Sequence, residues 1–152
     1  MSLIIATGSN IGNKLENLSS GKAALLKHFE IISESRIYKS KAVDYTSQPS
    51  FLNQVLEFKK PNLSPNSIMR LLIKLEIELG RKKYIDKGPR VIDLDILFIG
   101  LDKLSTPILT VPHPRLFERS FVLLPLKELN FYKELDKSFT FPSCIPPTAT
   151  PL

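Results

Sequence analysis

Residues 88–98 have the sequence Gly-Pro-Arg-Val-Ile-Asp-Leu-Asp-Ile-Leu-Phe, and the second half of this stretch is apolar apart from two acids placed two positions apart. Side chains alternate between the two faces of an extended strand. We therefore expect Asp93 and Asp95 to share one face. Their apolar neighbours at 92, 94 and 96 are expected to pack into a core on the other face, so this strand decides the fold.

The two carboxylates would lie roughly 6–7 Å apart at their Cβ atoms, two strand rises along the chain. Such a pair repels strongly unless a cation lies between the groups. Oxygen ligands on a rigid strand suit Mg²⁺, which binds through one or two carboxylates and the phosphates of a substrate. The alternative is an ordinary strand end whose acids face water. Arg90 either pairs with the acids structurally or binds the phosphate that the metal also holds.

The composition is typical of one soluble globular domain, because 43% of the 152 residues are hydrophobic and 24% are charged. No apolar run approaches the roughly 18 residues of a membrane span. The first expected strand begins at Leu3, so we expect no signal peptide. The single cysteine, Cys144, cannot form an internal disulfide, which agrees with a cytoplasmic location.

The formal net charge of +6 indicates an anionic partner, which could be nucleic acid, an acidic surface or a polyphosphate. One basic cluster directly precedes the paired acids, and Arg115 and Arg119 form a second group close to His113. A basic cluster beside two metal-type carboxylates is what binding of a nucleoside triphosphate with Mg²⁺ requires. Its lysines, taken singly, also fit a solvated charged loop. The first cluster consists of Arg81, Lys82, Lys83, Lys87 and Arg90.

Hydrophobic periodicity predicts the order strand, helix, strand, strand, helix, strand. The first helix is expected to begin at Asn13 with Glu16 as its capping partner, and the second at Ser64 followed by Pro65. This order matches the ferredoxin-like βαββαβ arrangement of α+β proteins, in which two helices pack on one face of an antiparallel sheet. The expected strands are residues 3–7, 31–38, 51–58 and 91–99.

Beyond the fourth strand, residues 106–114 contain three prolines and are expected to be irregular. Residues 121–129 have the pattern of a short amphipathic helix. The chain after Phe141 is rich in proline, and we expect a tail without fixed contacts to the core. The predicted organisation is therefore one domain over residues 1–141 and a proline-rich tail over residues 142–152.

The segment from Asp86 to Leu97, Asp-x-Gly-Pro-Arg-x-x-Asp-Leu-Asp-Ile-Leu, resembles the signature of the 6-hydroxymethyl-7,8-dihydropterin pyrophosphokinase family. Other motifs fall in that family's order and approximate spacing, and the resemblance covers about residues 3–130. It implies the ferredoxin-like fold and the direct in-line transfer of pyrophosphate from ATP to a pterin alcohol, with release of AMP, in folate biosynthesis. These motifs are Gly8-Ser9-Asn10, Phe51-x-Asn53, Glu76 before Gly80-Arg81, and Val111-Pro112-His113-Pro114 with Arg119 and Phe121.

The resemblance also implies the members of the site. It implies two Mg²⁺ ions held by Asp93 and Asp95, ATP as co-substrate, and a monomer that binds neither nucleic acid nor membrane. The implied catalytic residues are Asp93, Asp95, Arg90 and Lys83. The implied ATP-binding residues are Glu76, Arg90, Ile96, Thr110, His113 and Arg119. The implied pterin-binding residues are Ser40, Val43, Phe51, Asn53 and Phe121.

A pterin is a flat aromatic ring with an amide-like edge, so its pocket should offer two stacking surfaces and an in-plane hydrogen-bonding group. Phe51 and Phe121 are the stacking candidates by resemblance, and otherwise they fit core aromatics. Asn53 lies on the same strand face as Phe51, and a buried amide must be satisfied by some partner. His113 either donates to a phosphate oxygen or is a structural histidine in a proline-bounded turn.

Two other functions stay open. A ferredoxin-like RNA-binding module would share the topology and the basic charge, but it needs aromatic side chains on the central strands, where residues 91–98 offer acids. A catalytically silent scaffold is the other alternative. The segment Gly8–Lys14 lacks the spacing of a P-loop, so we interpret it as a tight strand-to-helix turn in which Asn10 is structural.

Overall fold

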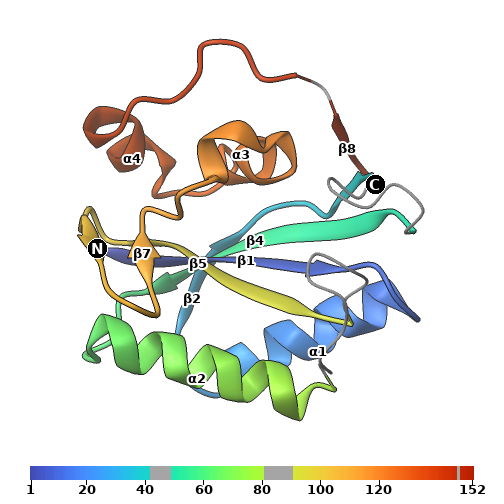
Figure 1. The fold of residues 1–152 in the computed structure, drawn as a ribbon. Coiled ribbons are helices and arrows are strands. Elements are labelled where there is room, and N and C mark those ends of the chain that lie inside the picture. Colours follow the sequence, from blue (N-terminus) through green and yellow to red (C-terminus); the bar gives the residue numbers. More distant parts are fainter. Residues whose placement is uncertain (42–48, 81–90, 147) are drawn as a thin grey trace.

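The computed structural model describes residues 1–41, 49–80, 91–146 and 148–152. A six-stranded sheet lies between two pairs of helices (Figure 1). Helices α1 (Lys14–Leu26) and α2 (Pro65–Glu78) cover one face, and α3 (Ser120–Leu126) and α4 (Tyr132–Ser138) cover the other. The strands of the sheet are β1 (Ser2–Ser9), β2 (Ile31–Glu34), β3 (Tyr38–Ser40), β4 (Phe51–Lys59), β5 (Asp93–Ile99) and β8 (Ala149–Pro151).

The strands follow the order β5-β1-β4-β3-β8, and β2 also pairs with β4. Every pairing in this sheet is antiparallel. A small hairpin of β6 (Leu104–Ser105) and β7 (Thr110–Val111) follows β5, and a single 3₁₀ turn, η1 (Leu116–Glu118), precedes α3. The predicted α+β class with an antiparallel sheet is confirmed.

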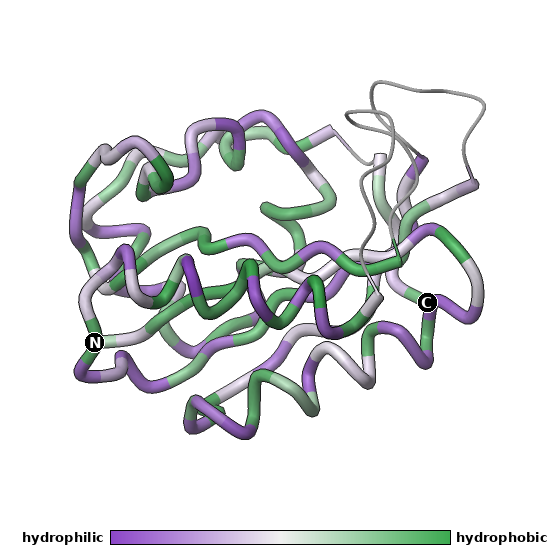
Figure 2. Tube along the Cα trace, turned by 60° about the horizontal axis from the view of Figure 1, so that its bottom comes forward, coloured by the Kyte–Doolittle hydropathy of each residue, from purple (hydrophilic) through white to green (hydrophobic). Residues whose placement is uncertain are grey.

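Strand β5 has the alternation that its sequence predicts. Ile92, Leu94 and Ile96 are at most 2% exposed and belong to the core that the sheet forms with α1 and α2. Leu97 faces a second core, which includes Leu123 of α3. Figure 2 shows hydrophobic and hydrophilic residues alternating along the coils of the helices, as expected for helices that bury one side.

The two long helices begin where the sequence predicts. The Asn13 side chain accepts a hydrogen bond from the Glu16 backbone N–H (3.1 Å), and the Glu16 carboxylate accepts one from the Asn13 amide (3.1 Å). Ser64 caps α2 by accepting from the Ser67 N–H (3.2 Å), and Pro65 occupies the first helical position. These contacts satisfy amide groups that have no partner within the helix.

The strand predicted over residues 31–38 is broken in the structure into β2 and β3. At the break, the Ser35 N–H donates to the Val55 carbonyl (3.0 Å), while the Val55 N–H donates to the Ser35 hydroxyl (3.0 Å). A side-chain oxygen thus replaces a backbone carbonyl in the ladder, which interrupts regular pairing. The periodicity of apolar residues does not predict this replacement of a backbone carbonyl by the Ser35 hydroxyl.

The expectation of a tail without core contacts is wrong. Strand β8 pairs with β3, Ala149 is only 4% exposed, and the Leu152 N–H donates to the Ile37 carbonyl (2.9 Å). Proline-rich composition suggested disorder, but a short strand at a sheet edge tolerates proline where its missing N–H points outward. Pro151 occupies such a position, opposite Tyr38.

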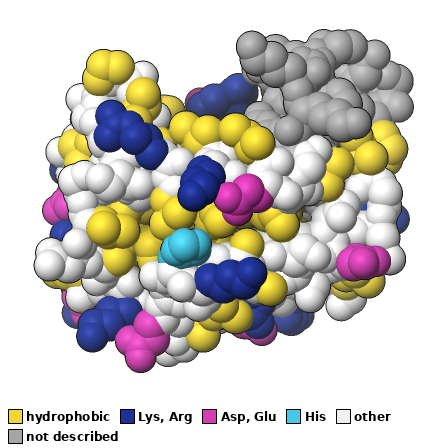
Figure 3. All heavy atoms as spheres, turned by 90° about the horizontal axis from the view of Figure 1, so that it is seen from below, with side chains coloured by type: hydrophobic (Ala, Val, Ile, Leu, Met, Phe, Trp, Pro, Cys, Tyr) yellow, Lys and Arg dark blue, Asp and Glu magenta, His cyan; other side chains and the backbone are white. Residues whose placement is uncertain are grey.

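Figure 3 shows the face covered by α1 and α2, on which hydrophobic side chains lie among charged ones. Large apolar residues exposed on these helices include Leu15, Leu26, Ile73 and Ile77. Scattered apolar residues are normal on a protein surface. Within the described ranges, no helix is both long and apolar enough to cross a lipid bilayer.

Helix α4, which the sequence did not predict, is held by a buried acid. Glu57 of β4 is 2% exposed, and its carboxylate accepts hydrogen bonds from the Ser2 hydroxyl (2.8 Å), the Ser33 hydroxyl (2.7 Å) and the Phe131 N–H (3.0 Å). Phe131 is the residue at the start of α4. One side chain therefore joins β1, β2 and the beginning of α4.

We predict that Glu57→Ala lowers the free energy of unfolding by about 2–4 kcal/mol, because it leaves two buried donors and the half-buried Ser33 hydroxyl without their acceptor. Urea unfolding followed by circular dichroism would measure this loss. The control is Glu30→Ala, whose side chain is exposed and whose removal should change stability by less than about 0.5 kcal/mol. Similar midpoints for the two variants would show that the Glu57 cluster is not stabilising.

Candidate active site

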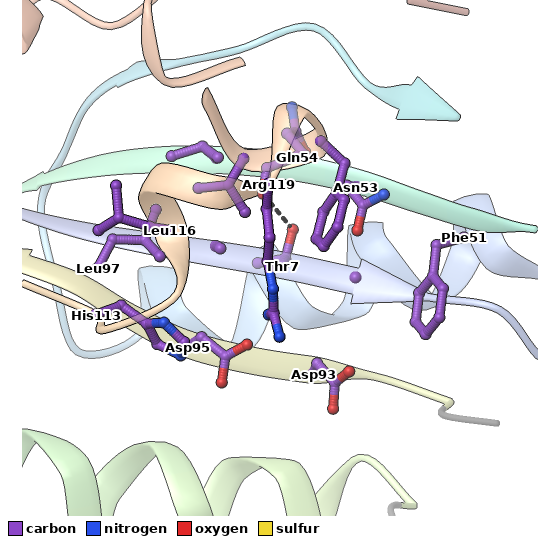
Figure 4. Close-up of a pocket in the computed structure, with 15 residues that line it drawn as sticks. Thr7, Phe51, Asn53, Gln54, Asp93, Asp95, Leu97, His113, Leu116 and Arg119 are labelled. Carbon is purple, nitrogen blue, oxygen red and sulfur yellow. Dashed lines mark hydrogen bonds between the residues drawn. The ribbon is translucent and has the colours of Figure 1, made fainter. Parts of the chain in front are cut away.

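Cross-strand register brings the paired acids and the predicted pterin ligand Asn53 together. Asp93 is opposite Gly8 of β1, and Gly8 is opposite Asn53 of β4. Asp95 lies in the neighbouring row, opposite Ala6. Directly opposite residues share a face of the sheet. Both carboxylates and the Asn53 amide therefore lie on the face covered by α3, as Figure 4 shows.

These side chains line a pocket between the sheet and the segment that runs from His113 into α3. Its members come from β1, β4, β5 and the beginning of α3, which are far apart in the sequence. Predicted site residues from all three functional groups are among them. The lining residues are Ala6, Thr7, Gly8, Phe51, Asn53, Gln54, Val55, Asp93, Asp95, Leu97, His113, Leu116, Arg119, Phe121 and Val122.

Gly8 forms the floor of this pocket. A Cβ atom at this position would lie 3.0 Å from Asn53 Oδ1 and 3.6 Å from Phe51 Cδ1. The interpretation of Gly8 as part of a turn is wrong, because β1 continues to Ser9. A glycine inside a strand often marks a close approach, and this was the available signal for its role.

Asn53 and Ser40 are joined directly. The Asn53 amide is 8% exposed, and its Nδ2 donates to the Ser40 hydroxyl (2.9 Å). This hydrogen bond fixes the carboxamide orientation and satisfies one of its donors. Asn10, expected to be structural, is 0% exposed and donates to the Pro49 carbonyl (3.3 Å) just ahead of β4.

Arg119 and Phe121 approach the pocket from the side of α3. The Arg119 guanidinium carbon lies 5.6 Å from the centroid of the Phe121 ring, which is a cation–π distance. Figure 4 shows the Arg119 side chain directed toward the strand that carries Asp93 and Asp95. The site therefore places a permanent cation opposite two acids.

His113 lies at the side of the pocket. Its backbone N–H donates to the Leu97 carbonyl of β5 (3.0 Å). The Arg115 N–H donates to His113 Nδ1 (3.3 Å), so the neutral ring carries its proton on Nε2. Burial, and then the charges of Arg119 and Arg115, hold the pKa of His113 below its ordinary value of 6.5. His113 is thus a neutral hydrogen-bond donor at pH 7.

A second pocket adjoins the first, since both include Asp95 and His113. It is lined by two further residues predicted to bind ATP, Ile96 and Thr110, and by residues 106–109, which connect β6 to β7. The Ile96 side chain is 2% exposed in the core, so a ligand here would meet its backbone at the edge of the sheet. The Thr110 hydroxyl hydrogen-bonds with that of Ser105 (3.2 Å).

Glu76, also predicted to bind ATP, is placed differently. It is 6% exposed on α2, and its carboxylate accepts from the backbone N–H of Leu94 (2.8 Å), the residue between the two acids. Neither pocket includes it among the described lining residues. Its position fits support of β5 rather than contact with a nucleotide.

Three predicted site residues, Val43, Lys83 and Arg90, lie outside the described residues. The other basic residues between Gly80 and Val91 share this status. Their assignment stays a prediction.

Asp93 and Asp95 have the chemistry that a hard divalent cation needs. Both supply carboxylate oxygens to one face of a rigid strand beside a pocket. The described part of the chain holds no cluster of three or more His, Cys, Asp or Glu residues that could bind a metal. Two carboxylates leave coordination positions for water and phosphate, which suits Mg²⁺ better than Zn²⁺.

Comparison with known proteins gives one consistent result. A family model described as 7,8-dihydro-6-hydroxymethylpterin-pyrophosphokinase (HPPK) matches residues 4–131. The chain is 42% identical over 127 residues to the 2-amino-4-hydroxy-6-hydroxymethyldihydropteridine pyrophosphokinase of Bacillus subtilis, covering 82% of this chain and 75% of that protein. It is 41% identical over 127 residues to the folic acid synthesis protein fol1 of Pneumocystis carinii, covering 83% of this chain.

The chain spans only 17% of the length of the Pneumocystis carinii protein. Among solved structures, Plasmodium falciparum HPPK-DHPS A437G/K540E, determined with pterin and p-hydroxybenzoate, matches with a TM-score of 0.63 and 14% identity. That match covers 84% of this chain and 39% of the other. At this identity the similarity concerns the fold alone.

We predict that NMR titration of the metal-free protein gives a His113 pKa below 6.5 and the Nε2–H tautomer. Because the folded pKa lies below the unfolded value, the neutral ring favours the folded state above about pH 6.5. That stability is lost as the pH falls through the folded pKa. His113→Gln should remove the titrating signal and so assign it. A value at or above 6.5, or an Nδ1–H tautomer, would contradict the prediction.

Proposed function

Because the chain belongs to the 7,8-dihydro-6-hydroxymethylpterin-pyrophosphokinase family, we propose that it transfers pyrophosphate from ATP to the hydroxymethyl group of 6-hydroxymethyl-7,8-dihydropterin. The products are AMP and the pterin pyrophosphate, a step of folate biosynthesis. One observation carries the proposal: Asp95 and His113 lie where two separate pockets adjoin. The transfer needs two substrates to meet at such a junction.

The pterin is assigned to the pocket of Phe51, Asn53 and Phe121. The two rings offer apolar surfaces for stacking, and the Asn53 carboxamide offers polar atoms in the plane of a ligand. Ser40 fixes the Asn53 amide by accepting one of its hydrogens. Gly8 leaves space for the ring, since a side chain there would meet Asn53 and Phe51. Val43 is proposed to contribute from outside the described residues.

ATP is assigned to the second pocket. The backbone of Ile96 at the sheet edge and the hydroxyl of Thr110 are polar groups suited to the nucleobase and sugar. His113 Nε2–H and the Arg119 guanidinium are donors suited to phosphate oxygens. Glu76 is proposed to act indirectly, by holding Leu94 and hence the strand of acids. Arg90 and Lys83 are proposed to neutralise further phosphate charge.

Asp93 and Asp95 are the proposed ligands of two Mg²⁺ ions. When bound, such ions neutralise phosphate charge and polarise the pterin hydroxyl. The residues of the chain hold the reactants so that the hydroxyl oxygen can attack the β-phosphorus in line. The bond between that phosphorus and the oxygen bridging to the α-phosphate breaks, AMP leaves, and the hydroxyl proton is released.

We further assign the core to the ferredoxin-like class. The support is the antiparallel order β5-β1-β4 followed by β2 and β3, with α1 and α2 on one face.

The protein is proposed to act in the cytoplasm as a monomer on its two small substrates, without a nucleic-acid partner. Two acids lining the pocket would repel an RNA backbone.

The test is AMP release from ATP, measured with and without the pterin alcohol and with and without Mg²⁺. The proposed function requires that AMP forms only when all components are present. Failure of the pterin alcohol to stimulate AMP formation would refute it. Salt-dependent retention on single-stranded RNA without nucleotide turnover would instead support an RNA-binding module.

We predict that Asp95→Ala lowers kcat at least about 100-fold, the order of loss when a group that stabilises transition-state charge is removed. The fold should survive, because Asp95 is half-buried at the pocket and is not part of either hydrophobic core, and circular dichroism would check this. The matched control is Asp102→Ala, which removes an exposed acid paired with Lys60 (3.5 Å) at the far end of β5. A wild-type rate in Asp95→Ala would remove the basis for the metal site.

A further inference from the structure

Strand β8 contacts the strand that carries one wall of the proposed pterin pocket. Ala149 lies opposite Ser40, the residue whose hydroxyl accepts the hydrogen bond from Asn53. Ser40 is also opposite Phe51, one of the proposed stacking residues. Since opposite residues share a face, Ala149 extends the row of Phe51 and Ser40 toward the sheet edge.

Strand β3 depends on this contact because it has only three residues. A strand of this length has little stability of its own and needs partners. The Leu152 N–H donates to the Ile37 carbonyl (2.9 Å), and hydrogen-bonded pairs recur every second residue in an antiparallel ladder. The Thr150 N–H, opposite Lys39, therefore also points at β3.

The same segment contacts the other side of the pocket. The Thr148 hydroxyl is hydrogen-bonded to the hydroxyl of Ser120, which is 5% exposed at the first position of α3. The neighbours of Ser120 in the sequence are Arg119 and Phe121, which both line the pocket. Helix α3 contacts both β3 and β8. Residues Thr148–Leu152 thus contact both sides of the pocket, the Ser40 side on the sheet and the start of α3.

We propose that residues Thr148–Leu152, the β8 strap, set the spacing between the Ser40–Asn53 wall and Phe121 and so determine affinity for the pterin. Thr148, through its hydroxyl, and Thr150, through its backbone N–H, are positioning residues in this role. The inference rests on the proposed function and deepens it. The strap lies beyond residues 4–131, which match the family. It therefore concerns a part of this chain that the match does not cover.

Sheet order makes the effect selective. The strap is at one edge of the sheet, and β5, whose edge faces the proposed nucleotide pocket, is at the other. Loosening the strap should move Ser40 and Phe121 without moving Ile96 or Thr110. Because Arg119, a proposed phosphate ligand, directly precedes Ser120, we expect the KM for ATP to rise as well, but less than the KM for the pterin.

The experiment measures kcat and both KM values from AMP release, together with binding of 6-hydroxymethyl-7,8-dihydropterin through its fluorescence without nucleotide. Thr148→Val and Ser120→Ala each remove the same hydrogen bond and should raise the pterin KM and dissociation constant about 5- to 10-fold. The double variant should bind pterin no more weakly than either single variant, because only one hydrogen bond exists to be lost.

Thr150→Pro removes the backbone N–H that points at β3 and should weaken pterin binding similarly. Thr150→Ala keeps this N–H and should leave pterin binding unchanged. Ser143→Val, at an exposed hydroxyl of the same tail, is the matched control.

The inference is overturned if Thr148→Val and Ser120→Ala bind pterin within 2-fold of wild type, or if ATP and pterin KM rise equally with a lower thermal midpoint. If Thr150→Pro does not fold, the two hydroxyl variants decide. Absence of pterin-dependent AMP release from the wild type would refute the proposed function itself. An active wild type with unaffected variants would refute only the role of the strap.

Discussion

The site depends on one constraint, the alternation of β5 between two unlike environments. Ile92, Leu94 and Ile96 are buried against α1 and α2, and burying such side chains stabilises the fold by about 1.5–3 kcal/mol each. Turning the strand over would expose all three and bury two carboxylates, so only one orientation is tenable. The core on one face thereby fixes Asp93 and Asp95 on the other.

Contacts at the open edge of β5 reinforce this orientation. Glu76 accepts from the Leu94 N–H, and the His113 N–H donates to the Leu97 carbonyl, so the strand is bonded outside the sheet at two points. Edge strands otherwise leave a row of unpaired backbone groups. The stretch between these two points contains Asp95 and Ile96, where the nucleotide pocket lies. A buried acid on α2 and a loop after β7 therefore define how much of the edge stays open to a ligand.

Local patterns in the sequence were sufficient for the parts of the fold that local physics determines. The caps at Asn13 and Ser64 and the alternation in β5 were predicted because each depends on residues within a few positions. Three features were not predicted: the break at Ser35, the start of α4 with its hydrogen bond to Glu57, and the pairing of β8. Each depends on a hydrogen bond between distant segments, and residue type alone does not specify that partner. The site was predictable mainly through its motif, while Gly8 became informative only once its neighbours across the sheet were known.

The pocket itself arises from a gradient of side-chain size along β1. On the face covered by α3 and α4, Ile4 fills the core with Leu97, Ala6 leaves a partial gap opposite Asp95, and Gly8 leaves an open one opposite Asp93. Close packing would otherwise fill this layer, because protein interiors hold few voids. The same interlayer space is thus core at one end of β1 and pocket at the other. Asp95 and Asp93 lie opposite the small residues Ala6 and Gly8 of β1. The small size of these residues, rather than any added element, leaves space for a substrate beside the acids.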